Sequence, residues 1–191
     1  MKVVLDIETI QAPREEWARL SGKLPPSAEL ESAGEGYDLF TAGAAEVQRR
    51  AEDEQYAKSA FDATFSQIVC IGLLEFSDHL EPRGSVAWYG GNEKELLKQF
   101  WSRLAQNRPA LFITHNGLGF DLPFLKKRSI IHQVKPSLDI NLAKFRTEPV
   151  YDTMAIWSNW DTRGWVKLDV LARALNVETK SGSGAQVAEM W

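Results

Sequence analysis

The sequence predicts a mixed α/β fold in which three strands connected in antiparallel order are followed by parallel strands, with helices on both faces of the sheet. A β-branched run occupies residues 2–7, and two strand-like runs follow one another at residues 67–76 and 84–89. Helix-like and strand-like segments then alternate from residue 92 to residue 176. Because the chain has 191 residues, one domain is expected.

The first strand and the segment after it differ in character. Residues 2–7 end at acidic positions, as is typical of a central strand whose carboxyl end opens into a site. Residues 11–66 hold several prolines and glycines in their first half and an Ala-rich, charged predicted helix at 44–60. They carry few large apolar residues, so we expect a single domain over residues 1–191 with an insertion at about residues 11–66.

The remaining elements follow from hydrophobic spacing and from start and stop signals. Residues 67–76 and 84–89 predict an antiparallel hairpin. Asn92, followed by Glu95 three residues later, predicts a helix start, and Asn107 predicts the end of that helix. The later elements are expected as a strand at 110–115, a helix at 120–131, a strand at 150–153, a helix near 151–157 and a helix at 167–176.

Composition excludes several classes of protein. The chain has 26 acidic and 22 basic residues, so it does not coat nucleic acid by bulk positive charge. Cys70 is the only cysteine, which excludes a disulfide within the chain and a cysteine zinc cluster. No apolar run approaches the roughly 20 residues of a membrane span, and Asp6 stands too early for a signal peptide. We therefore expect a cytoplasmic protein without a membrane partner.

Two groups of polar residues are candidates for chemistry. Asp6 and Glu8 are two positions apart on a strand, so both side chains point to the same side. Because two neighbouring carboxylates repel each other, a bound cation would stabilise them. A later strand runs into a turn with two glycines, where Asn116 is followed by Phe120 and Asp121. Taken alone, Asp121 also fits an acid that interacts with the dipole at a helix start. The two groups together indicate a functional site more specifically than either group does alone.

These two motifs resemble those of the DEDD family of 3′→5′ exonucleases, in particular proteins similar to the proofreading domain of family-B DNA polymerases. Asp6-Ile7-Glu8-Thr9 looks like the first exonuclease motif, and Asn116-x3-Phe120-Asp121 looks like the second. The resemblance spans most of the chain outside residues 11–66 and implies a ribonuclease H-like sheet.

The resemblance also implies a reaction and a ligand set. Asp6, Glu8 and Asp121 would be the catalytic acids and would hold two Mg²⁺ or Mn²⁺ ions, whose hard character suits oxygen ligands. Thr9, Asn116 and Phe120 would contact the terminal nucleotides, Phe120 by stacking or, alternatively, as a core anchor for its helix. The implied substrate is single-stranded DNA or a 3′ overhang, with RNA as an alternative and protein partners unknown.

The family's third motif, which is Tyr-x3-Asp or His-x4-Asp on a late helix, is not found before Trp191. We therefore expect the chain to be truncated at its C-terminus and to be weak or inactive by itself. Alternatively, Asp152, Asp161 or Asp169 supplies the missing acid, or the protein binds metal weakly without cleaving. Two other function classes remain open, a noncatalytic nucleic-acid-binding module and a ribonuclease H-like endonuclease.

Several other residues have both a structural and a functional interpretation. Arg128, at the end of the run that starts at Lys126, is a candidate contact for backbone phosphates, although such runs usually form a solvated helix face. His115 fits a hydrogen-bonded structural histidine better than a metal ligand. Trp157, Trp160 and Trp165 suit either base stacking or the packing of a loop.

Overall fold

The computed structural model describes residues 1–22 and 39–178, and within them the strands and helices fall into two compact units. Met1–Glu8 and Ile68–Trp191 form the first, which we call the sheet unit, and Thr9–Gln67 form the second. None of the helices in the described ranges is long and apolar enough to cross a membrane.

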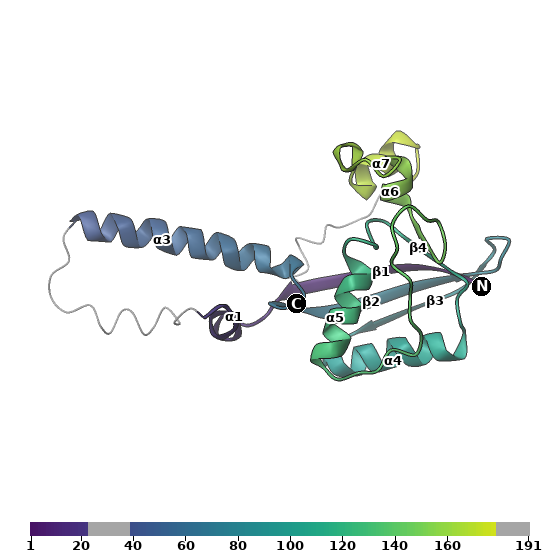
Figure 1. Cartoon of the computed structure of the whole chain (residues 1–191), viewed down its shortest axis with the longest axis horizontal. Coiled ribbons are helices and arrows are strands. Elements are labelled where there is room, and N and C mark those ends of the chain that lie inside the picture. The colour runs from purple at the N-terminus through teal and green to yellow at the C-terminus, as the bar shows by residue number, and fades with distance from the viewer. Residues whose placement is uncertain (23–38, 179–191) are drawn as a thin grey trace. The chain divides into compact units, whose positions relative to one another are not determined.

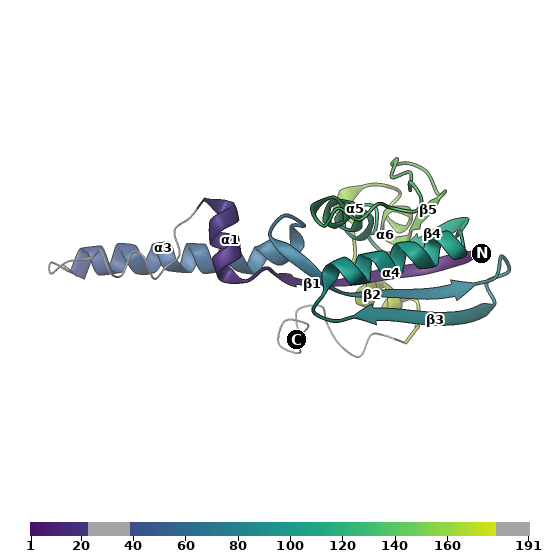
Figure 2. The same ribbon diagram turned by 90° about the horizontal axis from the view of Figure 1, so that it is seen from below.

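A five-stranded mixed sheet is the centre of the fold, with the strand order β3-β2-β1-β4-β5. The arrows of β1, β2 and β3 alternate in direction, and β4 lies beside β1 (Figures 1 and 2). β2 pairs antiparallel with β3, whereas β1 with β4 and β4 with β5 pair parallel. The strands are β1 (Lys2–Gln11), β2 (Ser66–Phe76), β3 (Pro82–Tyr89), β4 (Leu111–Thr114) and β5 (Val150–Asp152). The expected mixed α/β fold is confirmed.

The register of the parallel strands brings the carboxyl ends of β4 and β5 together beside the middle of β1. Val4 of β1 lies opposite Ile113 of β4, and Thr114 at the end of β4 lies opposite Asp152 at the end of β5. Open α/β sheets bind ligands at the carboxyl ends of their strands, because the loops that leave those ends gather there. This edge of the sheet is therefore the place to look for a site.

Two helices pack with the sheet to form the core, α4 (Glu93–Gln106) and α5 (Asp121–Ile131). Asn92 begins α4 as expected, since its side chain accepts a hydrogen bond from the Glu95 amide at 3.2 Å. Phe100 of α4 meets Trp88 of β3 edge to face, with the ring centroids 6.3 Å apart. The buried apolar face of α4 consists of Leu96, Leu97, Phe100, Trp101 and Leu104, the residues that the spacing predicted.

The chain after β5 forms short elements: α6 (Thr153–Trp157), the 3-10 turn η2 (Thr162–Gly164) and α7 (Leu168–Ala174). β5 and α6 confirm the strand expected at 150–153 and the helix expected near 151–157. α7 is shorter than the expected helix at 167–176, and Leu175 follows its last turn.

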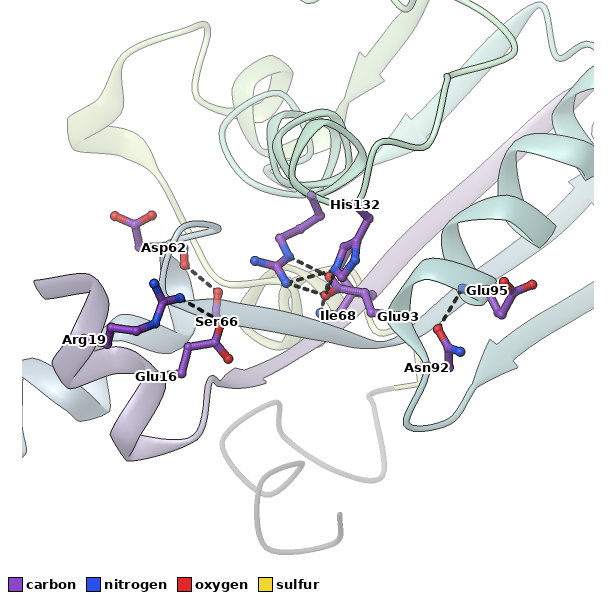
Figure 3. Close-up of polar contacts among 10 residues, drawn as sticks. Glu16, Arg19, Asp62, Ser66, Ile68, Asn92, Glu93, Glu95 and His132 are labelled. Carbon is purple, nitrogen blue, oxygen red and sulfur yellow. Dashed lines mark hydrogen bonds and ion pairs between the residues drawn. The ribbon is translucent and has the colours of Figure 1, made fainter.

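A buried ion pair joins α4, α5 and β2 (Figure 3). Glu93 accepts hydrogen bonds from the guanidinium of Arg128, at 2.8 and 2.5 Å, and from the amide of Ile68 at 2.9 Å. The ring nitrogen Nε2 of His132 lies 2.7 Å from the same carboxylate. Because Glu93 and Arg128 are 6% and 8% exposed, each needs the other to offset the loss of water around its charge.

The Thr9–Gln67 unit contains α1 (Arg14–Ser21), α3 (Leu39–Lys58) and the 3-10 turn η1 (Ser59–Phe61). Trp17 is buried and packs edge to face on Tyr56 at 5.6 Å. The Tyr56 hydroxyl donates to the carbonyl of Ala12 at 3.0 Å, and Arg14 pairs with Asp53. α3 includes most of the helix predicted at 44–60, whereas α1 was not predicted. That the whole chain is one domain with an insertion stays a prediction.

The Glu93–Arg128 pair predicts a large and local effect on stability. Glu93→Ala should lower the free energy of unfolding by about 3–5 kcal/mol, because it leaves the Arg128 guanidinium buried without its carboxylate. Glu95→Ala is the matched control on the same helix, since Glu95 forms an exposed pair with Lys98 and should cost less than about 1 kcal/mol. Urea unfolding curves would measure both, and equal losses would contradict the assignment.

Candidate active site

The two acids of β1 lie on the face of the strand opposite to its core residues. Asp6 is exposed and Glu8 is half-buried, whereas Leu5 and Ile7 are buried. The alternation matches the period of two expected from the sequence. Across the sheet, burial raises the pKa of the Cys70 thiol, and the charges of Glu8 and Asp6 raise it further. The Cys70 thiol of β2 therefore lies close to both acids.

Asp121 joins this pair from the start of α5. Its side chain is 4% exposed, and its carboxylate oxygen Oδ1 accepts a hydrogen bond from the Ile7 amide at 3.2 Å. The Ile7 amide lies between Asp6 and Glu8 in the chain, so an acid 114 positions away is attached to the strand between them. The structure thus attaches the third sequence-predicted acid to the strand that bears the first two.

The surroundings of Asp121 disfavour its charge. Burial, and after it the negative charge of Asp6, are the main causes that raise the pKa of Asp121 from 3.8 to about 7. The backbone amides of Asp121 and Ile7 lower this pKa, and the nearby charge of Asp152 raises it. Near neutral pH, therefore, Asp121 is divided between its protonated and ionised forms.

The four acids that are buried within the described residues differ in what balances their charge. Glu75 is paired with Arg103 at 2.7 Å, and Glu93 is paired with Arg128. Asp152 accepts several backbone amides. Asp121 has two amides, and it faces the like charge of Asp6. A buried carboxylate in these surroundings is the group that a cation would stabilise most.

The turn between β4 and α5 is shaped by Asn116 and two glycines. Asn116 has a φ of +68°, and its carbonyl accepts hydrogen bonds from the Gly119 and Phe120 amides at 3.0 and 2.8 Å. A Cβ at Gly117 would lie 2.4 Å from the Thr114 side chain, and one at Gly119 would lie 2.6 Å from Asn116 Oδ1. Only glycine fits the approach to the Thr114 Cβ at Gly117, whereas the terminal oxygen of Asn116 could move away from a Cβ at Gly119.

Asp152 holds this turn against the end of β5. Its side chain is 2% exposed; Oδ1 accepts from the Asn116 amide at 2.9 Å and Oδ2 from the Leu118 amide at 3.0 Å. Oδ1 also accepts from the Met154 amide at 3.1 Å and so caps α6. Sequence reasoning considered Asp152 as a strand-end acid or as the missing metal ligand. In the structure its oxygens bind backbone amides of the turn and of α6.

The structure places several other candidates away from open surface. Arg128 was expected to contact nucleic acid, but its guanidinium is buried against Glu93 and His132, because α5 turns that face toward α4. Phe120 is half-buried with its ring 5.2 Å from that of Phe124, an arrangement that leaves both of its interpretations open. Thr9 belongs to the other unit, where its hydroxyl donates to the Ala60 carbonyl at 2.9 Å.

The remaining candidates also have identified contacts. Asp161 is exposed and paired with Arg163 at 2.9 Å, and Asp169 is paired with Arg173 at 2.8 Å. His115 lies 2.9 Å from the Thr153 hydroxyl through Nδ1 and 2.9 Å from the Val166 carbonyl through Nε2. These contacts fit the structural interpretation of the histidine.

The donors at this site fit a hard divalent cation in their chemistry. Within the described residues, no group of three or more His, Cys, Asp or Glu side chains is placed so that it could hold a metal ion. Asp6 and Asp121 are nevertheless close enough that the charge of one raises the pKa of the other. Mg²⁺ commonly binds one or two carboxylates and completes its shell with waters and substrate phosphates, so two acids suffice as a starting set.

Comparison with known protein families and structures agrees with the fold and with the family resemblance. The model of a family described as "Predicted 3′-5′ exonuclease related to the exonuclease domain of PolB" matches residues 59–191. The family B DNA polymerase of the hyperthermophilic archaeon Pyrobaculum calidifontis superposes with a TM-score of 0.56 and 14% identity. That match covers 100% of this chain and 20% of the polymerase chain, and it supports the fold.

Curated relatives are DNA polymerases that are much longer than this chain. A DNA polymerase of Desulfurococcus sp. (strain Tok) is 31% identical over 90 residues, and one of Pyrococcus glycovorans is 29% identical over 91 residues. Each match covers 46% of this chain and 11% of the polymerase. The chain therefore spans about a tenth of the length of these relatives.

The raised pKa of Asp121 predicts how the stability of the metal-free protein depends on pH. Because the folded protein holds the Asp121 proton up to about pH 7 and the unfolded chain loses it near 3.8, unfolding becomes easier as pH rises between these values. The upper limit of this loss is about 4 kcal/mol. Asp121→Asn keeps an oxygen for the Ile7 amide and carries no charge, so the variant should lack this loss.

Urea unfolding in EDTA at about pH 5 and about pH 8 would measure the difference between the two proteins. Asp139→Asn serves as the control, because the Asp139 side chain is 89% exposed. Parallel pH profiles for the wild-type protein and Asp121→Asn would show that Asp121 ionises normally.

Proposed function

Because the chain belongs to the family of predicted 3′-5′ exonucleases related to the exonuclease domain of PolB, we propose that it hydrolyses phosphodiester bonds at the 3′ end of single-stranded DNA or of unpaired 3′ ends. RNA is the alternative substrate. One observation carries the proposal. Asp121 is buried at the start of α5 and binds the strand that bears Asp6 and Glu8, and no cation among the described residues balances its charge.

Two Mg²⁺ or Mn²⁺ ions are the proposed cofactors. In this proposal Asp6, Glu8 and Asp121 hold them through carboxylate oxygens, the ligand type that these hard cations prefer. When bound, such ions supply a hydroxide nucleophile near neutral pH and stabilise the charge on the leaving oxygen. A cation would also favour the ionised form of Asp121, which the surrounding protein disfavours.

The protein's own contribution is to fix the positions of these acids. The Ile7 amide orients Asp121, and Asp6 lies on the exposed face of the same strand. Asp152 sets the turn that carries Asn116 and Phe120, the proposed contacts to the terminal nucleotides. Stacking on an aromatic ring accepts any base, which suits an enzyme that shortens strands of any sequence.

The polarity of digestion is the direct test of the proposal. With Mg²⁺ or Mn²⁺, a label on the 3′ end of a single strand should be released first, whereas a 5′ label should remain on progressively shorter products. Asp6→Ala and Asp121→Asn should each lower the rate at least about 100-fold, because loss of even an outer-shell partner of a metal ligand costs about 10–100-fold. Protein in excess over DNA allows slow hydrolysis to be measured.

Asp78→Asn is the matched control, since Asp78 is 74% exposed on the turn between β2 and β3 and its loss should leave the rate unchanged. Release of the 5′ label before the 3′ label, or full release by Asp6→Ala, would refute the exonuclease. Cleavage of circular DNA would assign an endonuclease, because an exonuclease requires an end. Binding to 3′ overhangs without any cleavage would assign a noncatalytic module.

Metal binding can be tested without a turnover assay. At about pH 8, saturating Mn²⁺ should stabilise the wild-type protein by about 2.7 kcal/mol at 100 times its dissociation constant. Asp6→Asn and Asp121→Asn should lose most of the resulting increase in melting temperature, and Asp78→Asn should keep it. Equal increases in all four proteins would place the metal elsewhere.

A further inference from the structure

A long irregular loop connects α5 to β5, over residues 132–149. Loops of this length without secondary structure are uncommon in compact domains and are usually functional or disordered. This one is attached to the body of the sheet unit, since Val134 and Ile140 are buried and the Lys126 ammonium group contacts Asp139 at 2.9 Å. Beyond Ile140 the loop becomes exposed and carries Phe145.

Phe145 and Trp160 form an aromatic pair outside the core. Their ring centroids are 5.3 Å apart, and Phe145 is 74% exposed. Both residues have left-handed backbone conformations, with φ of +62° for Phe145 and +66° for Trp160. Such conformations are unusual for bulky residues, persist only where the surrounding structure enforces them, and concentrate at binding sites.

Trp160, one member of the pair, is connected through α6 to the candidate active site. Trp160 follows α6, and its amide donates to the carbonyl of Ala155 within that helix at 2.7 Å. α6 in turn begins at Asp152, whose carboxylate binds the Asn116–Phe120 turn. α6 has five residues, so it is about 7.5 Å long, and Trp160 follows its last residue by three positions. Two further exposed rings, Trp157 and Trp165, belong to the same segment.

Positive side chains accompany the aromatic pair. Lys144 and Arg146 flank Phe145 in the chain and are exposed, and neither forms an ion pair within the residues that the structure describes. The nearby acid Asp161 is paired with Arg163. The loop itself has two exposed carboxylates, Asp139, which is paired with Lys126, and Glu148. Exposed rings with adjacent unpaired cations match bases and phosphates of a single strand better than they match an apolar protein surface.

We propose that Phe145 and Trp160, with Lys144 and Arg146, form a stacking platform for single-stranded DNA a few nucleotides from the scissile bond. Phe145 presents its free ring face to a base, and the two cations contact the phosphates on either side. Trp160 supports Phe145 from behind. The inference rests on the proposed function in one respect, because the bound strand is taken to be the one whose 3′ end reaches Asp6 and Asp121.

Binding in EDTA tests the platform separately from hydrolysis. The probe is a fluorescein-labelled oligothymidylate of about 12 nucleotides, within the site size of single-strand-binding domains, and fluorescence anisotropy gives its dissociation constant. Phe145→Ala should weaken binding about 5-fold to 150-fold, the range that loss of stacking on one base produces. Phe61→Ala, which removes a 73% exposed ring from η1, should leave the affinity unchanged.

Two further measurements separate stacking from charge. An abasic strand with the same number of phosphates should bind wild-type protein and Phe145→Ala equally, because it offers no base to stack. The double variant Lys144→Ala/Arg146→Ala should reduce the slope of log affinity against log salt by about 1.4, or about 0.7 for each phosphate that the protein no longer neutralises.

Unchanged affinity of Phe145→Ala for the oligothymidylate would overturn the platform, as would an equal loss on the abasic strand. Loss of self-association in Phe145→Ala with unchanged DNA binding, measured by sedimentation, would assign the rings to a protein contact instead. A protein that releases 3′ nucleotides normally but binds DNA independently of Phe145 would refute the platform and leave the exonuclease intact. If binding depends on Phe145 but no hydrolysis occurs, the platform is supported and the exonuclease is refuted.

Discussion

The hydrogen bond from the Ile7 amide to the Asp121 carboxylate joins the central strand β1 to the start of helix α5. It requires that the helix begin where the strand exposes an amide between two acidic side chains. The carboxyl ends of β4 and β5 lie together beside the middle of β1, because Val4 is opposite Ile113 and Thr114 is opposite Asp152. The position of Asp121 relative to Asp6 and Glu8 depends on this junction.

Helix α5 is held at both of its ends, by different means. At its start the attachment is Asp121, whose charge the protein disfavours; toward its end it is Arg128, whose charge is balanced by Glu93. Trp101 and Ser129 add a hydrogen bond of 2.9 Å between α4 and α5. An unfavourable charge at one end of a helix is tolerable when the rest of the helix is fixed, which is how folds maintain strained functional groups.

The net charge of −4 and the arrangement of the exposed cations both favour local contacts with the proposed substrate. Because binding by bulk charge is excluded, the DNA contact that we propose requires a few local groups. Arg128, the cation that the sequence suggested, is used inside the protein. Exposed cations next to an exposed ring instead occur at Lys144 and Arg146, on a loop whose relation to the acids only the folded chain reveals.

The sequence alone determined the mixed α/β order, the hydrophobic face of α4, the common side of Asp6 and Glu8, and the two motifs, because these depend on local period and spacing. Tertiary structure alone decided which acid is buried without a cation, that Asp152 binds the Asn116 turn, that Arg128 faces Glu93, and that Phe145 meets Trp160. Each of these depends on contacts between residues that are distant in the chain. Burial and the nearest charges, which set the chemistry of a carboxylate, are properties of packing and leave no periodic signal in the sequence.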